Sequence, residues 1–448
     1  MGIASPPSGS LGGRYVLVIL DGLGDRPHPD TGGVSPIVAA ATPNLDRLSA
    51  EGALGLVSVL GPGVAPESDA GVLALLGYDP VVDSPGRGVL EALGVEIPLD
   101  RGDVAFRLNF ATFDGAGGVV DSRVGRSLTT GEARELAAAL TSADLLADAK
   151  VHAQVRATVG HRGVLWLHPT DGAALSPEVS NSDPFYEKVG GMGQARRVES
   201  PRSLEVKPLN GSDAALRTAS ATNAFLGRAT ELLAGHRVNA RRALSGKRIA
   251  NGLLVRNAGA LPPAGRPELF SAKYGVRGAA VTEMPVERGI ARLFGLDDLY
   301  VGPMGADRDA AFRERARITR EALREHPFVY VHLKGPDEPG HDGLAVAKQE
   351  VIEQIDRSFF APFLDGLDRS VVRVAVTADH ATPCILKGHS DDPVPLLLAG
   401  AGVAPGADRG PSSARVKFGE VSAAEGGLGS RPGSDVLRLL LTGVLRSA

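Results

Sequence analysis

The stretch YVLVILDG (residues 15–22) decides the fold predicted for this chain. Six consecutive apolar residues, three of them β-branched, end at an acidic residue and a glycine. An unbroken run of this kind is typical of a parallel strand that is buried on both faces and leads into a loop. Three later runs have the same character, and they read FVYVHLKG (328–335), VVRVAVTADH (371–380) and VPLLLAG (394–400).

Helical patterns separate these runs. TPNLDRLSAEG (42–52) has proline at its first helical position and ends at glycine, and DAAFRERARITREALREH (309–326) is also helical in pattern. Buried strands that alternate with helices predict an α/β fold with a mainly parallel sheet and helices on both faces.

Residues 99–212 follow a different pattern. VAFRLNFATFD (104–114) alternates like a half-buried strand, and residues 170–212 are polar and rich in Gly, Ser and Pro. We therefore expect a small α+β domain with a long loop, inserted into a core formed by residues 14–98 and 213–448. The first 13 residues, MGIASPPSGSLGG, are expected to be a disordered leader.

The composition excludes several classes of function. The chain has 448 residues, 43% of them apolar and 22% charged, with a net charge of −4, so nucleic-acid and membrane binding are not expected. Cys384 is the only cysteine, which gives no support to secretion. No apolar run approaches the ~18 residues of a membrane span. We expect a cytoplasmic enzyme, with a homo-oligomer left open.

Short polar loops hold a set of hard metal ligands. Each group follows a buried run or lies in a turn rich in Gly and Pro, where a parallel sheet places its binding loops. Carboxylates and imidazoles drawn from both ends of the chain predict a centre of two divalent ions. The candidates are Asp21, Asp337, His341, Asp379, His380 and His389.

Ser68, in the sequence PESDAG, adds a nucleophile to this set. The run AGVLALLGY after it predicts a helix that starts at the serine, with N-terminal amides that would face a bound phosphate. A serine here can also serve simply as a helix cap. Beside metal ions its hydroxyl becomes a nucleophile, and the chemistry predicted is phosphoryl transfer.

Several basic residues are candidates for binding an anionic substrate, because guanidinium groups match planar anions. Many of the chain's arginines are expected to be solvated surface, and Arg123 and Arg126 are favoured because they lie in a glycine-containing loop. The other candidates are Arg87, Arg107, Arg256, Lys334 and Lys387.

Taken in order, these motifs resemble those of the archaeal-type, cofactor-independent phosphoglycerate mutases of the alkaline phosphatase superfamily. The resemblance covers nearly the whole chain after the leader. The motifs that carry it include GYDP (77–80), EALG (91–94), GHDG (340–343), VTADH (376–380) and HSDDPVP (389–395).

The resemblance implies an alkaline-phosphatase-like core with two divalent ions, which are manganese, magnesium, zinc or cobalt. Ser68 would take the phosphate of 3-phosphoglycerate as a phosphoserine, and the 2-hydroxyl would recover it. Carried over by motif, one ion would be held by Asp337, His341 and His389, and the other by Asp21, Ser68, Asp379 and His380.

The chain departs from the family pattern in three places, one of which is the loop 180–200, which keeps NSDPFYEK (181–188) but otherwise drifts. Glu67 precedes the nucleophile where glycine is usual, and residues 302–315 replace a segment rich in Thr and Asp. A paralogous phosphatase, or a phosphotransferase on another small hydroxy acid, amino acid or phosphonate, therefore stays open. A catalytically silent metal-binding homologue is the third alternative.

Overall fold

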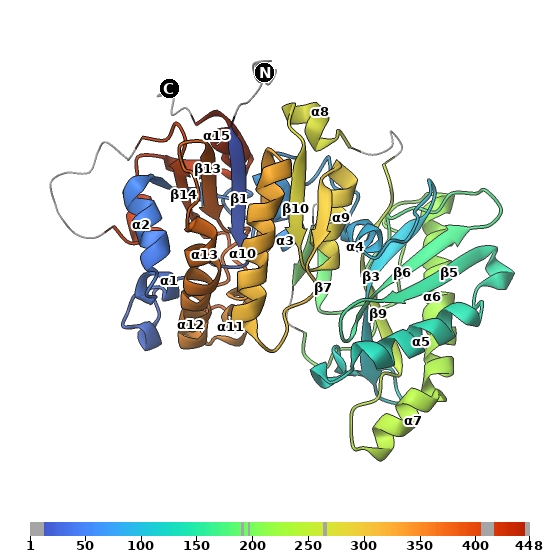
Figure 1. Ribbon diagram of the computed structural model, residues 1–448. Coiled ribbons are helices and arrows are strands. Elements are labelled where there is room, and N and C mark those ends of the chain that lie inside the picture. The colour runs from blue at the N-terminus through green and yellow to red at the C-terminus, as the bar shows by residue number, and fades with distance from the viewer. Residues whose placement is uncertain (1–12, 190–191, 196–197, 263–266, 405–415, 444–448) are drawn as a thin grey trace. The chain divides into compact units, whose positions relative to one another are not determined.

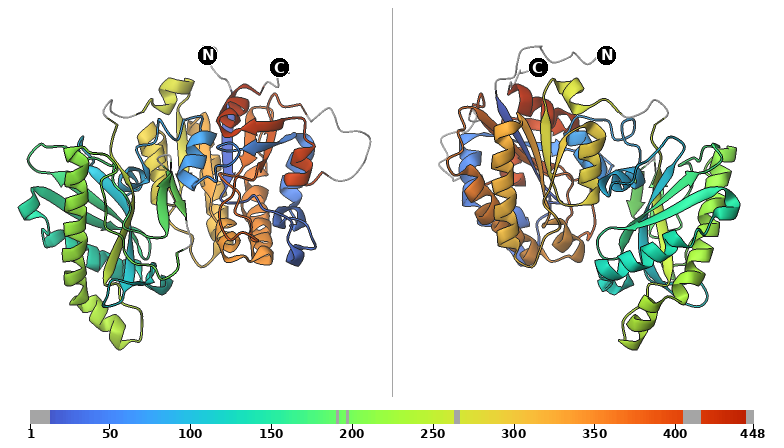
Figure 2. Two further views of the ribbon diagram at one scale, coloured as in Figure 1. Left: turned by 180° about the vertical axis from the view of Figure 1, so that it is seen from behind. Right: turned by 45° about the vertical axis from the view of Figure 1, so that its right-hand side comes forward.

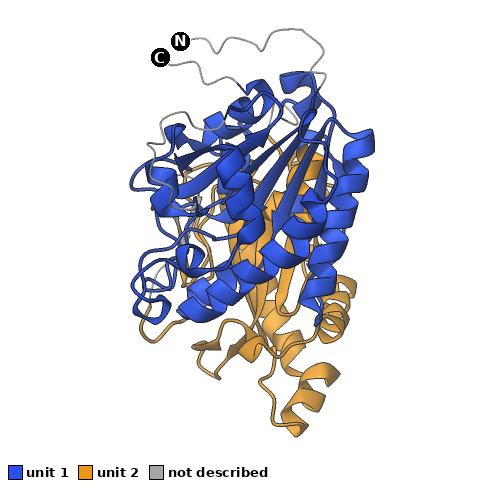
Figure 3. Cartoon of the chain, turned by 60° about the vertical axis from the view of Figure 1, so that its left-hand side comes forward, with its two compact units in different colours: residues 1–83, 268–287, 294–448 blue, residues 84–267, 288–293 orange. Residues whose placement is uncertain are grey.

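The computed structural model describes residues 13–189, 192–195, 198–262, 267–404 and 416–443. The chain divides into two compact units, coloured separately in Figure 3. The predicted leader lies outside the described residues apart from Gly13. None of the described helices is long and apolar enough to cross a membrane. The first unit contains residues 1–83, 268–287 and 294–448, and the second contains 84–267 and 288–293.

An eight-stranded sheet forms the centre of the first unit. β1 (Arg14–Leu20) lies between β12 (Phe328–Leu333) and β13 (Val372–Thr377) and is parallel to both. Within the described sheet only β14 (Val394–Gly400) runs in the opposite direction. Across the sheet the order is β11 (Asp297–Tyr300), β10 (Gly278–Thr282), β12, β1, β13, β14, β2 (Ala53–Ser58) and β15 (Gly429–Pro432).

Helices cover both faces of this sheet, and every residue of β12 and β13 is buried. α10 (Arg308–Glu325) lies on the face toward the viewer in Figure 1, and α15 (Val436–Thr442) lies on the other face, which Figure 2 shows from behind. The predicted α/β fold is thus confirmed. The other helices of this unit are α1 (Pro36–Ala39), α2 (Pro43–Glu51), α3 (Ser68–Leu75), α8 (Phe270–Tyr274), α9 (Pro285–Phe294, in part), α11 (Asp337–Asp342), α12 (Ala345–Ile355), α13 (Ala361–Leu364) and α14 (Glu420–Ala424).

The start of α2 is capped by a residue that is distant in the sequence. Thr42 occupies the N-cap position, but its side chain makes no capping hydrogen bond. The Asp356 carboxylate instead accepts hydrogen bonds from the backbone N–H groups of Asn44 (3.1 Å) and Leu45 (2.8 Å). It also accepts one from the Asn44 side chain, at 2.9 Å. Asp356 therefore satisfies donors that a helix start leaves open.

We expect Asp356→Ala to lower the free energy of unfolding by about 1–3 kcal/mol, because it leaves these donors without an acceptor. Urea unfolding followed by circular dichroism measures the change. Thr42→Ala is the matched comparison, and its effect should be clearly smaller. Equal losses in the two variants would contradict the assignment of the cap to Asp356.

The second unit is built on an antiparallel sheet. Its strands are ordered β4-β3-β6-β5, and β9 pairs with β3. These strands are β3 (Val104–Phe113), β4 (Val119–Asp121), β5 (Val151–Ala157), β6 (Arg162–Pro169) and β9 (Gly252–Gly259), and a separate hairpin contains β7 (Tyr186–Val189) and β8 (Met192–Ala195). The helices are α4 (Arg87–Gly94), α5 (Thr130–Ser142), α6 (Asp213–Ala234) and α7 (Arg237–Leu244).

The boundaries of this unit lie outside the range 99–212 expected from the sequence. The second unit also takes in residues 84–98 and 213–267. The cause is β9, which pairs antiparallel with β3 although more than a hundred residues separate them in the chain. A pairing of this range leaves no local signal in the sequence.

Candidate active site

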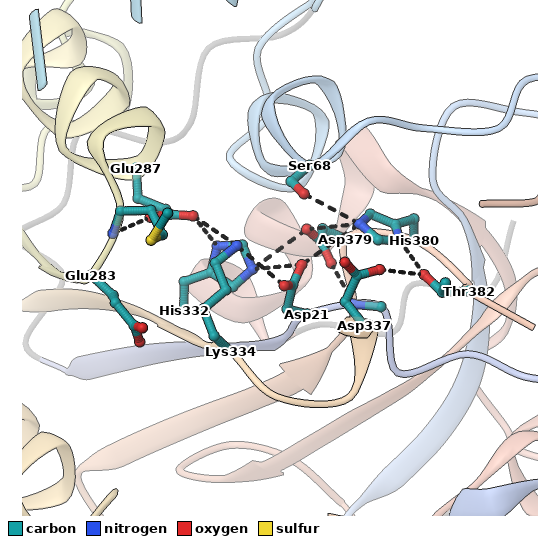
Figure 4. Close-up of polar contacts among 12 residues, drawn as sticks. Asp21, Ser68, Glu283, Glu287, His332, Lys334, Asp337, Asp379, His380 and Thr382 are labelled. Carbon is teal, nitrogen blue, oxygen red and sulfur yellow. Dashed lines mark hydrogen bonds and ion pairs between the residues drawn. The ribbon is translucent and has the colours of Figure 1, made fainter. Parts of the chain in front are cut away.

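The carboxyl ends of β1, β12 and β13 meet at one edge of the first unit's sheet, because the three strands are parallel neighbours. Asp21 directly follows β1, Asp337 begins α11 after β12, and Asp379 follows β13. Figure 4 shows the three carboxylates converging on one region, with Ser68 opposite them at the start of α3. Neighbouring strand ends thus bring residues from both ends of the chain together.

Asp337, His341 and His389 form one group of converging ligand atoms. The Asp337 Oδ1 atom lies 3.5 Å from the Nε2 atom of each histidine, and the two Nε2 atoms are 3.2 Å apart. Carboxylate and imidazole atoms at such separations can surround one divalent ion. His380 lies beside this group, with its ring stacked on that of His389 at 3.8 Å.

Asp21 and Asp379 form a second group with His380. The Nε2 atom of His380 lies 3.6 Å from Asp21 Oδ1 and 3.5 Å from Asp379 Oδ2. Both oxygens are buried and lack a hydrogen-bond partner among the described residues. Buried carboxylate oxygens in this state are costly unless a cation neutralises them. Their donor set therefore fits a divalent ion.

Ser68 and Glu67 lie at the N-terminus of α3. The Ser68 hydroxyl is 3.3 Å from His380 Nε2, within the second group. Glu67 occupies the N-cap position without a side-chain capping hydrogen bond. Burial would lower the pKa of His389, but Asp337 and then the charge of Glu67 raise it to about 10. The extra acidic residue before Ser68 thus acts on an imidazole of the first group.

The carboxylates at the strand ends favour positive charge in their surroundings. Burial alone would raise the pKa of Asp21, but Lys334 and His332 hold it well below its usual value. Burial would lower the pKa of Lys334, but Asp21 and Glu287, 3.3 and 2.8 Å away, hold it above its usual range. Clustered carboxylates thus keep their neighbours positively charged.

Two features fix the loops that carry these ligands. Gly22 has a φ of +62°, and a Cβ atom there would lie 2.7 Å from Asp337 Oδ1, so a side chain would collide with the group. Behind the loops, the fully buried Lys348 ammonium donates to the Asp25 carboxylate (2.8 Å), Gly24 carbonyl (3.1 Å) and Thr382 carbonyl (2.9 Å). This lysine therefore ties the loop after β1 to the loop after β13.

The predicted arginines divide into two sets, all in the second unit. Arg87 and Arg256 are largely buried, whereas Arg123 and Arg126 are exposed near a 3-10 turn, η2 (Val124–Arg126). Lys334 lies in the first unit, at the carboxylate edge. Lys387 contributes its carbonyl oxygen, 3.4 Å from His341 Nδ1.

A buried cationic cluster surrounds Glu91 in the second unit. The Nε atoms of Arg87 and Arg107 each lie 3.3 Å from Glu91 Oε1, and Arg256 pairs with Asp183 at 2.5 Å. Burial, with Arg87 and Arg256 nearby, lowers the pKa of Arg107 to about 9. Arg162 acts on the same glutamate. Four guanidinium groups thus face two carboxylates, an excess that suits an anionic ligand.

Sequence reasoning missed four residues of these clusters, namely His332, Glu287, Arg162 and Asp183. His332 stands two positions before Lys334 on β12, so the two side chains point to the same face of the strand. That spacing is the one signal in the sequence that could have linked His332 to the carboxylate edge. Glu287 and Arg162 have no comparable signal, because their partners come from distant segments.

The mainly parallel sheet and its ligand-bearing edge define an α/β protein with a candidate active site at its strand ends. Comparisons with known proteins place it further. The family model described as 2,3-bisphosphoglycerate-independent phosphoglycerate mutase matches residues 49–239. Proteins of that name from Aeropyrum pernix and Methanopyrus kandleri are 46% and 40% identical to this chain. The alignments cover 86% and 95% of this chain, and 90% and 96% of those proteins.

Two solved structures are similar over nearly their whole length. A protein from Pyrococcus horikoshii has a TM-score of 0.74, and a cofactor-independent phosphoglycerate mutase from Thermoplasma acidophilum has a TM-score of 0.62. Each is 31% identical, with 97% and 96% of this chain and 99% of those chains covered. The chain belongs to the 2,3-bisphosphoglycerate-independent phosphoglycerate mutase family and is an enzyme of the isomerase class.

Proposed function

We propose that the protein interconverts 3-phosphoglycerate and 2-phosphoglycerate, without bisphosphoglycerate, by metal-dependent phosphoryl transfer through Ser68. The observation that carries the proposal is the position of the Ser68 hydroxyl, 3.3 Å from His380 at a helix N-terminus beside two groups of ligand atoms. The names of the relatives support the substrates.

Two divalent ions, drawn from manganese, magnesium, zinc and cobalt, fit the donor atoms. Asp337, His341 and His389 would hold one, and Asp21, Asp379, His380 and Ser68 the other. The unpartnered oxygens Asp21 Oδ1 and Asp379 Oδ2 support this division. When bound, the ions would lower the pKa of the Ser68 hydroxyl and neutralise charge on the phosphoryl oxygens.

The Ser68 oxygen then attacks the phosphorus of 3-phosphoglycerate. The bond from Oγ to phosphorus forms as the bond from phosphorus to the oxygen on C3 breaks, and that oxygen takes up a proton. In the return step the 2-hydroxyl loses a proton and its oxygen bonds to phosphorus as the bond from phosphorus to Ser68 Oγ breaks. Oγ takes up a proton, which restores the hydroxyl. A phosphoryl group on Ser68 would lie at the N-terminus of α3, where the first amides of the helix would favour its negative charge.

The buried arginines of the second unit are proposed to bind the carboxylate of the substrate. Arg107 is central, because its buried Nε atom lies 3.3 Å from Glu91 Oε1 without a hydrogen bond to any of the described residues. We assign the same role to Arg87 and Arg256, because both are candidates from the sequence and both belong to the buried cluster around Glu91. Three further contacts to the substrate stay proposed, namely the exposed Arg123 and Arg126 and the Lys334 beside Asp21.

We expect Arg107→Met to raise KM by about 10- to 100-fold, because it removes a charged donor from a buried site. Steady-state kinetics with 3-phosphoglycerate measure the change. Arg241→Met, which removes an exposed arginine paired with Glu135 at 3.0 Å, is the control and should leave KM unchanged. A KM for Arg107→Met equal to that of the unaltered protein would contradict the role of the cluster.

The proposed function is tested by loading the purified protein with Mn²⁺ and following 3-phosphoglycerate by ³¹P NMR without bisphosphoglycerate. Appearance of 2-phosphoglycerate at equilibrium supports the proposal. Failure to form it, together with release of inorganic phosphate from other esters, would reject the mutase in favour of a phosphatase with the same centre.

A further inference from the structure

His332 is a buried imidazole to which the family motifs assign no role. It lies on β12 with 1% of its surface exposed. Its Nε2 atom is 3.6 Å from Asp21 Oδ1 and 3.4 Å from Asp379 Oδ2. All three atoms are buried and have no hydrogen-bond partner among the described residues. Figure 4 shows this ring reaching the two carboxylates from the side of β12.

The separations fit atoms that share one ion. The same two oxygens lie 3.6 and 3.5 Å from His380 Nε2, so each oxygen stands between two imidazole nitrogens. These distances are too long for good hydrogen bonds. They are close to the roughly 3.3–3.6 Å that separates ligand atoms about 2.0–2.2 Å from a common ion in tetrahedral coordination.

The outer nitrogen of His332 is held as in the other histidines of the site. His332 Nδ1 lies 3.0 Å from the Tyr330 hydroxyl and 3.5 Å from Glu287 Oε1. A ligating histidine normally has its second nitrogen fixed by such a partner, which leaves the first free for the ion. In the other three histidines of the site, the Nε2 atom faces the ligand groups and the Nδ1 atom lies near an oxygen outside them. These oxygens are the Lys387 carbonyl for His341, the Thr382 hydroxyl for His380 and the Pro66 carbonyl for His389.

We propose that His332 is a further ligand of the ion held by Asp21, Asp379 and His380. The inference rests on the metal dependence proposed above. Two carboxylates and two imidazoles would then bind the ion without Ser68. The Ser68 oxygen could therefore dissociate from the ion when it becomes bonded to phosphate. Two imidazole nitrogens also favour zinc, cobalt or manganese over magnesium, which prefers oxygen.

The test is metal binding by His332→Gln, measured by calorimetry and elemental analysis with Co²⁺ and with Zn²⁺. We expect the affinity for the ion held by Asp21, Asp379 and His380 to fall by at least about 10-fold. The affinity for the ion held by Asp337, His341 and His389 should stay unchanged. The visible absorption of bound Co²⁺ should change as an imidazole is lost. His326→Gln is the matched control, because His326 is also buried and lies near a carboxylate, Asp297 at 3.6 Å, just before the same strand.

Wild-type affinity and an unchanged cobalt spectrum in His332→Gln would overturn the role of His332 and leave the proposed function standing. A wild-type protein that binds no ion would overturn both. Should His332→Gln not fold, anomalous diffraction from Co²⁺-loaded crystals of the unaltered chain decides the question. A cobalt ion within bonding distance of His332 Nε2 supports the inference, and one bound to Asp21 and Asp379 with His332 turned away overturns it.

Discussion

Ser68→Ala is expected to lower turnover by at least about 10³-fold, because it removes the atom that is proposed to accept the phosphoryl group. The phosphoenzyme should disappear as well, which rapid acid quenching and intact-mass spectrometry measure as the loss of one phosphate. Metal content should change little. The carboxylates and imidazoles of both ligand groups remain, and Ser68 adds a single hydroxyl to one of them.

Ser212→Ala is a suitable control for this variant. Ser212 also lies at the start of a helix, where its hydroxyl accepts a hydrogen bond from the Ala215 amide. Its loss should cost about 0.5–2 kcal/mol of stability without affecting the phosphoenzyme. A phosphorylated Ser68→Ala protein would place the nucleophile elsewhere.

Removing the divalent ions is expected to have the second large effect. Treatment with a chelator should reduce turnover to the background rate, and addition of Mn²⁺ should restore it. The thermal midpoint should fall as well, because the buried carboxylates of Asp21 and Asp379 would lose the cation that is proposed to neutralise them. At a free ion concentration one hundred times Kd, binding contributes about 2.7 kcal/mol to the free energy of unfolding.

Differential scanning calorimetry with and without chelator measures the change in midpoint, and a coupled assay follows turnover in the same samples. Asp297→Asn is the matched control. Asp297 is also an aspartate of this unit's sheet, but it belongs to edge strand β11, away from β1 and β13, and should respond to the chelator as the unaltered protein does. A chelated protein with full turnover and an unchanged midpoint would rule out metal dependence.

The sequence predicted the part of the site that depends on strand ends. Asp21 and Asp379 follow apolar runs that are typical of buried parallel strands, and parallel neighbours bring their carboxyl ends to one edge. His332 escaped this reasoning because it lies within its strand rather than after it. Its proposed role depends on which strands flank β12, and the order of strands in the sheet cannot be predicted from the sequence of β12 alone.

The second unit was harder to predict for a related reason. The run GLLVRNAG (252–259) looks like one more strand of the core, but it pairs with β3. Likewise Glu91 becomes a partner of Arg107 only once α4 and β3 have packed together. Contacts between segments far apart in the chain are decided by tertiary packing, to which local patterns are blind.

The place of β1 between β12 and β13 also has a consequence for biosynthesis. At ordinary translation rates of about 5–20 residues per second, roughly 20–70 s pass between synthesis of β1 and synthesis of β13. β1 has neither of its two neighbours until β12 has been made, and it lacks the second until β13 follows. The centre at its end cannot take up an ion until the last third of the chain has been made. Nascent chains should therefore depend on chaperones, and ion uptake should mark the completion of folding rather than its start.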